Sequence, residues 1–379
     1  MTAAATGGAP ARRRILVAIG TRPEAIKMAP LVLALRAEPW AEVRILATAQ
    51  HRQMLDQVLE AFGLEPDVDL DIMRPNQALP ELTARLLLQL DEVLASEAPD
   101  AILAQGDTTT VLAVALAAFY RRIPLGHVEA GLRTGDLANP FPEEMNRVVA
   151  GRLARWHFAP TAQARDNLLA EGFDPATVHV TGNTVIDALL QVAGREPPLP
   201  VAVPAGKRLV LVTAHRRENF GAPFREVCLA IRDLADAHPD IHVLYPVHPN
   251  PNVEAPAREL LSGHPSITLC APLDYLPFVA AMQRATLVLT DSGGVQEEAP
   301  ALGKPVLVMR RETERPEAVT EGVVQLVGPD REAIVAAASR LLSDPAAYAA
   351  MARGTSPYGD GHAAGRIAAI LRASLAPAA

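Results

Sequence analysis

The sequence has few cysteines, no long apolar run and no excess of positive charge, and each shortage excludes a class of protein. Only Cys228 and Cys270 occur, so a disulfide framework is excluded and a reducing cytoplasm is the expected location. With 35 Lys and Arg against 43 Asp and Glu, the net charge of −8 argues against a broad nucleic-acid-binding surface. No apolar run could span a bilayer and no signal-peptide pattern opens the sequence, so we expect no membrane association.

Cofactor fingerprints are missing as well. No GxGxxG follows the first predicted strand, which removes the nicotinamide-binding pattern. No GxxxxGK[ST] occurs, so a Walker-type nucleotide hydrolase is not expected. The absence of HExxH and of paired CxxC argues against a dedicated metal site. The sequence therefore predicts a protein that works without a cofactor.

Short apolar runs alternate with amphipathic helical segments, such as Met54–Phe62 and Leu82–Leu94, through nearly the whole chain. This alternation predicts parallel sheets covered by helices on both faces. The predicted strands are Ile15–Ile19, Val43–Ala47, Ala101–Ala104, Leu125–Val128 and Trp156–Ala159, followed by Leu209–Thr213, His242–Pro246, Ile267–Leu269, Leu287–Thr290 and Val306–Met309.

At 379 residues the chain exceeds the usual size of a single core, so two domains are expected. Four prolines among the fourteen residues of Gly194–Lys207 interrupt the alternation and indicate a linker. We predict a disordered tail over residues 1–13 and two Rossmann-like α/β domains that face one another across a cleft. The first covers residues 14–183 plus 363–379, and the second covers residues 184–362.

In open α/β sheets, ligands bind beyond the carboxyl ends of the strands, beside helix N-termini. Five predicted strand ends carry unusual polar clusters, and this concentration points to the functional site. The clusters are Gly20–Glu24, Gln105–Thr110, His127–Arg133, Ala214–Asn219 and Thr290–Glu298.

Three of these clusters suit an anion. Arg22, with Lys27 about one turn further along the predicted helix, could bind a diphosphate, although a capped turn with a solvated arginine explains the motif equally well. A lone histidine is more often structural than functional, but His215 precedes two arginines, which an anion explains better.

The third anion-binding candidate is the turn Ser292-Gly293-Gly294, between a predicted strand and a predicted helix. Its free backbone N–H groups and close backbone approach are the ingredients of a phosphate nest. Glu298 lies about one turn later and could accept hydrogen bonds from two ribose hydroxyls. Glycine-rich turns also occur as plain connectors.

The remaining clusters supply carboxylates. Asp107 precedes three threonines, and a helix cap would explain one threonine but not the aspartate as well. Glu129 emerges from an apolar strand, where burial or a nearby carboxylate would raise its pKa toward a range useful for proton transfer. Glu143 and Glu144 begin a predicted helix, where ionised glutamate is favoured even without a function.

Several long, irregular strings in the chain carry a family resemblance that spans about Ile15 to Leu371. They include GTRPEAIKMAPL, GHVEAGLRTGD, PFPEEMNR, TDSGGVQEEAP and LGKPVLVMRRETERPEAV. The sequence resembles the non-hydrolysing UDP-N-acetylglucosamine 2-epimerases of bacteria. The resemblance implies a glycosyltransferase-B-like fold, a homodimer, and interconversion of UDP-N-acetylglucosamine (UDP-GlcNAc) with UDP-N-acetylmannosamine (UDP-ManNAc) for surface polysaccharide synthesis. It also implies elimination and re-addition of UDP through a 2-acetamidoglucal intermediate.

The resemblance implies roles for particular residues of this chain. Those implied to be catalytic are Asp107, Glu129, Glu143 and His215. Those implied to bind substrate are Arg22, Lys27, Asp107, Glu129, His215, Phe278, Ser292, Gly293, Gly294, Glu298 and Arg315. Those implied to bind a second UDP-GlcNAc as an activator are Gln50, Gln77, Glu144, Arg217 and His248. The chain departs from many members at Ala214, where they have glycine.

Other functions remain open from the sequence alone. A glycosyltransferase of the same fold would need an acceptor site, and the carboxylates of the first half favour proton chemistry instead. A hydrolysing epimerase differs only in its products. A regulator that merely binds a UDP-sugar would not need these carboxylates. UDP-sugars modified at C3 or C6 also remain candidate substrates.

Overall fold

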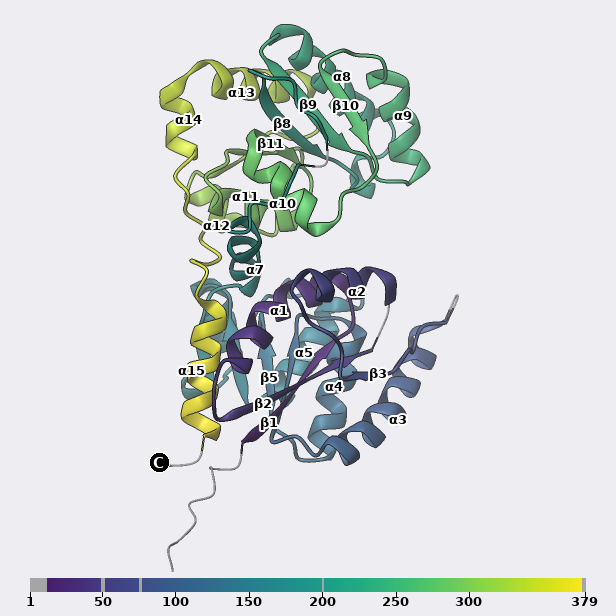
Figure 1. Cartoon of the computed structure of the whole chain (residues 1–379), viewed down its shortest axis with the longest axis vertical. Helices are drawn as coiled ribbons and strands as arrows, with labels where there is room; N and C mark the ends of the chain where they lie inside the picture. The colour runs from purple at the N-terminus through teal and green to yellow at the C-terminus, as the bar shows by residue number, and fades with distance from the viewer. Residues whose placement is uncertain (1–11, 49–51, 75–76, 200, 377–379) are drawn as a thin grey trace, which may run out of the picture. The chain divides into compact units, whose positions relative to one another are not determined.

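A computed structural model describes residues 12–48, 52–74, 77–199 and 201–376, and of residues 52–54 only the backbone. The chain forms two compact units. The first runs to Ala188 and resumes at Gly361, and the second extends from Leu189 to Asp360 (Figure 1).

The first unit contains a seven-stranded parallel sheet with the order β3-β2-β1-β4-β5-β6-β7. Its strands are β1 (Arg13–Ile19), β2 (Ala41–Ala47), β3 (Val68–Asp69), β4 (Ala101–Gln105), β5 (Leu125–Val128), β6 (Trp156–Ala159) and β7 (Val178–Val180). Its helices are α1 (Arg22–Arg36), α2 (Arg52–Ala61), α3 (Leu79–Glu97), α4 (Thr109–Tyr120), α5 (Glu143–Leu153), α6 (Ala162–Ala170), the short 3-10 helix η1 (Pro175–Thr177) and α15 (Ala363–Leu375), while α7 (Thr184–Ala193) spans the boundary between the units.

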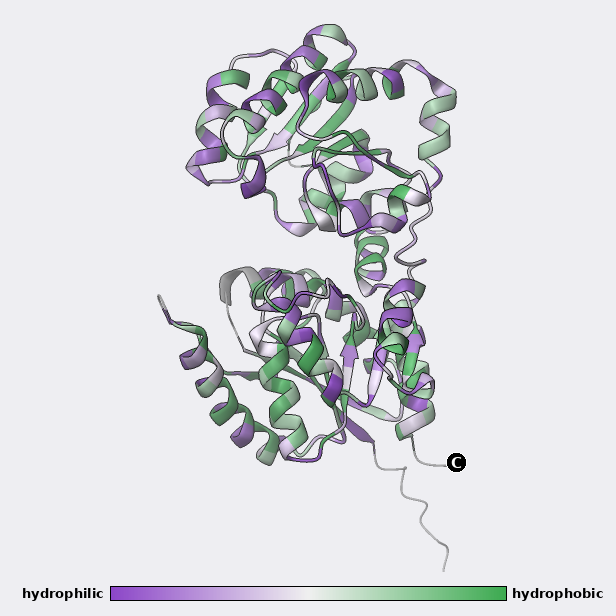
Figure 2. Ribbon diagram, turned by 180° about the vertical axis from the view of Figure 1, so that it is seen from behind, coloured by the Kyte–Doolittle hydropathy of each residue, from purple (hydrophilic) through white to green (hydrophobic). Residues whose placement is uncertain are grey.

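Burial explains why these runs form strands and helices. The central strands β1 and β4 are buried along most of their length, as expected for a parallel sheet covered by helices, and Figure 2 colours strands of the second unit mostly as hydrophobic. Helix α3 instead buries one stripe at four-residue spacing, formed by Leu82, Leu86, Leu90 and Leu94. The spacing of apolar residues along the sequence therefore distinguishes the buried strands from the amphipathic helices.

The C-terminal helix α15 packs on the first unit, beside α1 (Figure 1). The buried Asp187 of α7 accepts hydrogen bonds from the backbone N–H groups of Ala363 and Ala364, at 3.2 and 2.8 Å. Arg366 donates to the carbonyl oxygen of Thr181 at 3.1 Å. A carboxylate at the start of a helix stabilises its exposed N–H groups, so α7 anchors the returning chain.

The second unit contains a six-stranded parallel sheet with the order β10-β9-β8-β11-β12-β13. Its strands are β8 (Arg208–Thr213), β9 (Ile241–Pro246), β10 (Ile267–Cys270), β11 (Ala285–Thr290), β12 (Val306–Val308) and β13 (Val324–Leu326). Its helices are η2 (Arg217–Asn219), α8 (Ala222–Ala237), α9 (Pro251–Leu261), α10 (Tyr275–Arg284), α11 (Gly293–Ala301), α12 (Pro316–Thr320), α13 (Arg331–Ser343) and α14 (Pro345–Met351).

The predicted fold class is confirmed, since both units are Rossmann-like parallel α/β structures. Every predicted strand is present, but three edge strands, β3, β7 and β13, were not predicted because runs of two or three residues give no periodic signal. The predicted tail lies outside the described residues up to residue 11, and its last residue, Arg13, already belongs to β1. Among the described residues, no helix is long and apolar enough to cross a membrane.

Candidate active site

In each sheet, the predicted polar clusters follow strands that are neighbours. β1, β4 and β5 adjoin in the first sheet, and β8 and β11 adjoin in the second. Because parallel strands end at the same edge of a sheet, each set of clusters meets at one edge. The strand order reverses between β1 and β4 and again between β8 and β11, and such switch points are where open α/β sheets bind ligands.

Glu129 is a buried carboxylate at the first switch point that accepts from several side-chain donors. Lys27 donates to its two oxygens at 2.6 and 2.8 Å, Asn183 donates at 2.8 Å, and the Gln105 amide donates to Oε2. Its backbone has a φ of 62°, an uncommon conformation for a non-glycine residue that is often found at functional sites. A cation and two amide donors favour the ionised carboxylate.

Asp107 lies in the same cluster but is less fully paired. Burial raises its pKa to about 6, opposed by the Arg147 guanidinium 3.6 Å away. The charge of Glu129 raises the pKa of Asp107 further, Lys27 lowers it, and Glu143 raises it. A carboxyl group with a pKa near neutrality can both give and take a proton at physiological pH.

The loop that carries Asp107 is fixed by a buried histidine. His127 contacts the carbonyl oxygen of Gly106 through Nε2 at 2.7 Å, and burial lowers its pKa to about 4. The neutral ring therefore donates its Nε2 hydrogen to this carbonyl. From the other side, the Asn146 amide donates to the carbonyl oxygen of Asp107 at 2.9 Å.

Glu143 and Glu144 begin α5 but differ in environment. Glu143 is partly exposed, and its charge raises the pKa of Asp107. Glu144 is buried, accepts from the backbone N–H groups of Thr134 and Gly135 at 3.0 and 3.1 Å, and pairs with Arg147 at 2.9 Å. Within the first unit, Glu144 therefore stabilises the loop before α5, whereas Glu143 belongs to the Asp107 cluster.

Arg22 is the first residue of α1 and is partly exposed. Thr21 caps this helix, and Pro23 suits its first turn because it has no N–H group to leave unpaired. Lys27, which was predicted to join Arg22 at a diphosphate, pairs with Glu129 at 2.6 Å.

The second switch point is organised by Asp291, which is fully buried. It accepts from the backbone N–H groups of His215 and Arg216, each at 2.8 Å, and so fixes the loop after β8. Burial lowers the pKa of His215, partly offset by Asp291, and His248 and Arg216 lower it further. The rings of His215 and His248 stack with centroids 5.5 Å apart.

The Ser292-Gly293-Gly294 turn opens α11, with Ser292 at the cap position making no side-chain capping bond. The guanidinium of Arg315 lies so close that a Cβ on Gly293 would be 3.4 Å from its Cζ, and Glu297 accepts from this guanidinium at 2.7 Å. A Cβ on Gly294 would meet no described atom within 4 Å. Free helix N–H groups, a cation and open space are together suited to an anion.

Two further predicted residues belong to the same unit. Glu298 is buried on α11, and the Tyr275 hydroxyl donates to its Oε1 at 3.3 Å. Phe278 is partly exposed, one turn after Tyr275 on α10. The contact between α10 and α11 thus fixes the orientation of the glutamate.

The residues predicted to bind an activator do not form one cluster within a unit. Gln50 lies outside the described residues. Gln77 accepts a hydrogen bond from Arg85 at 2.9 Å in the first unit. In the second unit, Arg217 is exposed on η2, whereas His248 contacts the predicted substrate residue His215.

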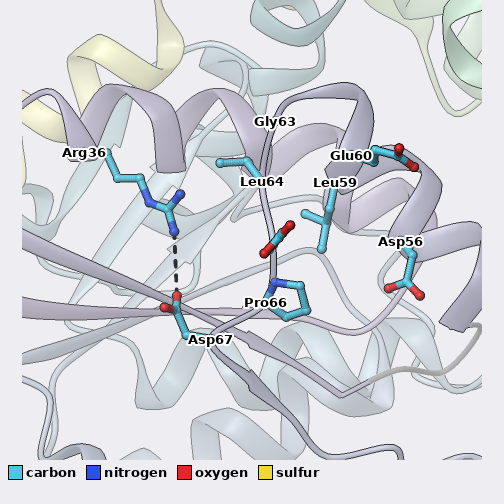
Figure 3. Close-up of a pocket in the computed structure, with 9 residues that line it drawn as sticks. Arg36, Asp56, Leu59, Glu60, Gly63, Leu64, Pro66 and Asp67 are labelled. Atoms are coloured by element: carbon cyan, nitrogen blue, oxygen red, sulfur yellow. Dashed lines mark ion pairs between the residues drawn. The ribbon is translucent and has the colours of Figure 1, made fainter.

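A separate hollow of about 680 Å³ lies in the first unit, away from the switch point (Figure 3). It is bordered by Asp56 and Glu60 of α2 and by the ion pair between Arg36 and Asp67, 3.7 Å apart. It contains no predicted site residue. Within the described ranges, no group of three or more His, Cys, Asp or Glu side chains is arranged to hold a metal ion.

The sequence did not single out several residues on which this geometry depends. Arg147, Asn183 and Asp291 make the contacts that hold Asp107, Glu129 and the loop after β8. Asp291 lies in a predicted polar cluster and Arg147 in the predicted helix that Glu143 begins, so proximity to the site was the available signal for these two. Asn183 follows β7, which was not predicted.

Comparison with known proteins identifies the family. The family model described as UDP-N-acetylglucosamine 2-epimerase matches residues 33–372. The UDP-N-acetylglucosamine 2-epimerase of Escherichia coli K12 is 54% identical over 369 residues, which cover 95% of this chain and 98% of that protein. The crystal structure of UDP-GlcNAc 2-epimerase from Neisseria meningitidis bound to UDP-GlcNAc is 46% identical, with a TM-score of 0.85, and covers 94% of this chain and 99% of that one.

A more distant structural likeness bears on the fold alone. The glycotransferase of kitacinnamycin has a TM-score of 0.65 at 15% identity and covers 97% of this chain and 100% of that one. This likeness agrees with a glycosyltransferase-B-like architecture of two Rossmann-like units. The family model and the 54% identity over nearly the full length show that the chain belongs to the UDP-N-acetylglucosamine 2-epimerase family.

Proposed function

We propose that this protein reversibly epimerises UDP-GlcNAc to UDP-ManNAc at C2 without hydrolysing it, by eliminating and re-adding UDP through a 2-acetamidoglucal intermediate. The single observation that carries the mechanism is the carboxylate cluster at the first switch point. There Asp107, with a pKa near 6, lies in the field of the paired Glu129 and of Glu143. Inverting a carbon that carries an unactivated hydrogen requires groups that remove a proton and return it to the other face, and this cluster supplies them.

In the elimination step, a carboxylate removes the proton from C2 while the bond from C1 to the diphosphate oxygen breaks. The electron pair of the C–H bond forms the C1–C2 double bond, and the electrons of the C–O bond leave with UDP. Re-addition reverses both changes after a proton arrives on the opposite face of C2. We assign the proton exchange to Asp107 and Glu143, whose environments differ most from that of the tightly paired Glu129.

The departing UDP needs stabilisation because its diphosphate gains charge as the bond breaks. The helix N-terminus at Gly293 and Gly294, the Arg315 guanidinium beside it and the ring of His215 support an anion site in the second unit. We assign the ribose hydroxyls to Glu298, which is oriented by Tyr275. The proposed substrate-binding set also includes Arg22, Lys27, Phe278 and Ser292.

The proposal is tested by incubating the enzyme with UDP-GlcNAc in deuterated water and following the products by NMR. Deuterium at C2 of both UDP-sugars, with no free sugar, is the expected result. Complete retention of the original C2 hydrogen would overturn the proton-exchange mechanism. Release of free N-acetylmannosamine and UDP would identify a hydrolysing epimerase instead, and transfer to an added acceptor would identify a glycosyltransferase.

We also propose a homodimer and, as the family resemblance implies, an activating UDP-GlcNAc, with the enzyme acting in the cytoplasm. Exposed apolar side chains on two helices that pack together, α3 and α4, support the dimer. They are Leu88 of α3 and Phe119 and Tyr120 of α4, which are 58 to 71% exposed. Sedimentation at assay concentrations tests the dimer. A sigmoidal dependence of the initial rate on UDP-GlcNAc would support the activator.

A further inference from the structure

The loop from Arg310 to Arg315 lies at the proposed anion site, but the proposed chemistry uses only its last residue. It follows β12, which adjoins β11 in the second sheet, so the loop and the turn Ser292-Gly293-Gly294 lie at the same sheet edge. At the start of the loop, the buried Arg310 donates to Glu218 of η2 at 2.6 Å. The loop is thus joined to the one that carries His215.

Three hydrogen bonds connect Arg315 to the anion-binding turn through two other side chains. The backbone N–H of Arg315 donates to Thr313 Oγ1 at 3.1 Å, and the Thr313 hydroxyl donates to Gln296 Oε1 at 2.6 Å. Gln296 Nε2 donates to the carbonyl oxygen of Ser292 at 3.2 Å. The direction of all three bonds is set at the two ends, because a backbone N–H only donates and a carbonyl oxygen only accepts.

The middle of this hydrogen-bond chain is buried. Gln296 lies near the start of α11 and is fully buried, so each end of its amide needs a partner inside the protein. Its nitrogen is paired with Ser292 and its oxygen with Thr313. Gln296 is therefore held in one orientation, and it holds the Thr313 hydroxyl in turn.

The neighbouring residue of α11 holds the other end of the same arginine. Glu297 is buried and accepts from Arg315 Nε at 2.7 Å, and a Cβ on Gly293 would lie 3.4 Å from Arg315 Cζ. Glu297 contacts only the far end of a long side chain, whereas Thr313 holds its backbone. An arginine fixed in advance loses less conformational freedom when it binds an anion, so it binds that anion more tightly.

We propose that Thr313 is a positioning residue for Arg315 and that, through Gln296, it fixes the guanidinium beside the turn that binds the diphosphate of UDP. This inference rests on the proposed function, in which that turn receives the departing UDP. Thr313 acts on UDP only through the arginine.

The first test is Thr313→Val, which removes the hydroxyl and keeps the shape of the side chain. Its affinity for UDP, measured by calorimetry, should fall by roughly two- to tenfold, the factor that one hydrogen bond is worth. In the Arg315→Gln background the same substitution should have no effect, because the residue through which it acts is gone. Thr313→Ser keeps the hydroxyl and should bind UDP as the wild type does.

The matched control is Thr268→Val, which removes a partly buried hydroxyl that contacts His242 Nε2 at 2.8 Å in the same unit. Its UDP affinity should equal that of the wild type. If Thr313→Val does not fold, Gln296→Met replaces it, since methionine keeps the length of the side chain and has no amide.

The second test needs no nucleotide. In protein labelled with ¹⁵N at the arginine side chains, the Nε–H signal of Arg315 is assigned with Arg315→Gln. In Thr313→Val, or in Gln296→Met, this hydrogen should exchange with solvent roughly two- to tenfold faster, because the arginine leaves Glu297 more often. Thr313→Ser and Thr268→Val should keep the wild-type rate.

Two outcomes would overturn the inference. One is an unchanged exchange rate of Arg315 Nε–H in the folded variant, and the other is the same loss of UDP affinity with and without Arg315. Either would reduce Thr313 to a residue that stabilises the loop. If the wild type did not bind UDP, the proposed function would fail, and the exchange rate alone would decide the inference.

Discussion

The two switch points of this molecule have the same topology and opposite chemistry. At the first, between β1 and β4, burial raises the pKa of the partly exposed Asp107 to about 6 and that of the buried Glu24 to about 7. At the second, between β8 and β11, the buried carboxylate of Asp291 accepts backbone N–H groups, and the neighbouring turn presents glycines. Burial raises the pKa of the two carboxyl groups at the first switch point, whereas the carboxylate at the second holds the loop after β8 in place.

This difference suggests that the first unit carries out proton transfer and that the second unit binds UDP. A proton-transfer group must change its charge during the reaction, so it needs an environment in which neither state is strongly favoured. A phosphate site needs fixed donors that do not titrate, such as helix N–H groups and arginine. Substitutions at the first switch point should therefore slow turnover, and substitutions at the second should weaken UDP binding.

The largest expected effect is on turnover in Asp107→Asn and Glu143→Gln. Each amide keeps the shape of the side chain but cannot carry the proton, so kcat should fall by about 10²- to 10⁴-fold. The affinity for UDP, measured by calorimetry, should stay near the wild-type value because neither residue is assigned to the nucleotide. Asp91→Asn, which breaks an exposed ion pair with Arg121 in the same unit, is the control and should turn over normally.

If both variants kept most of their turnover, the assignment of proton exchange would be wrong even with the fold and substrate correct. If they lost UDP affinity in proportion to kcat, the division between the units would fail instead. The loss of kcat and the loss of UDP affinity therefore test two different claims. The first tests the roles of Asp107 and Glu143 in proton exchange, and the second tests whether these residues act apart from UDP binding.

A smaller effect is expected from His215→Ala at the second switch point. Loss of a charge-assisted contact to the diphosphate costs about 1.5–3 kcal/mol, which is roughly tenfold or more in affinity for UDP. His238→Ala, which removes a contact with Ser339 elsewhere in the same unit, is the matched control. Calorimetry that found the same UDP affinity in both variants would contradict the placement of His215 at the anion.

The two sheets and the positions of the polar clusters could be predicted from the sequence. Apolar runs indicate strands, and ligands bind beyond the ends of parallel strands. The βα alternation predicted both sheets, and the polar clusters after β1, β4, β5, β8 and β11 do meet at two sheet edges. The short edge strands carried too few residues for a pattern. The domain bounds and the roles of the site residues stay predictions.

The electrostatic character of each carboxylate could not be predicted, since it depends on partners distant in sequence. A raised pKa of Glu129, from burial or a nearby carboxylate, stays a prediction. The sequence did not indicate that Lys27 and Asn183, more than fifty residues away on either side, donate hydrogen bonds to it. Arg147 reaches Asp107 from α5 in the same way. Sequence patterns identify the residues at a sheet edge, whereas their pairing is set by the tertiary fold.

The smallest effect, and the most specific test of the second switch point, is expected from Tyr275→Phe. Burial and the neighbouring Glu298 raise the pKa of Tyr275 well above its usual value, so the hydroxyl stays protonated and donates to Glu298. Its loss should cost about 0.5–1.5 kcal/mol, or roughly two- to tenfold in affinity for UDP, with kcat unchanged. Tyr348→Phe, on α14, is the control.

If Glu298 binds the ribose, an analogue of UDP without ribose hydroxyls should bind the wild type and Tyr275→Phe equally, because the contact that Tyr275 orients is already absent. An equal loss for both ligands would instead assign the tyrosine to the packing of α10 on α11, and Glu298 would lose its place in the proposed nucleotide site.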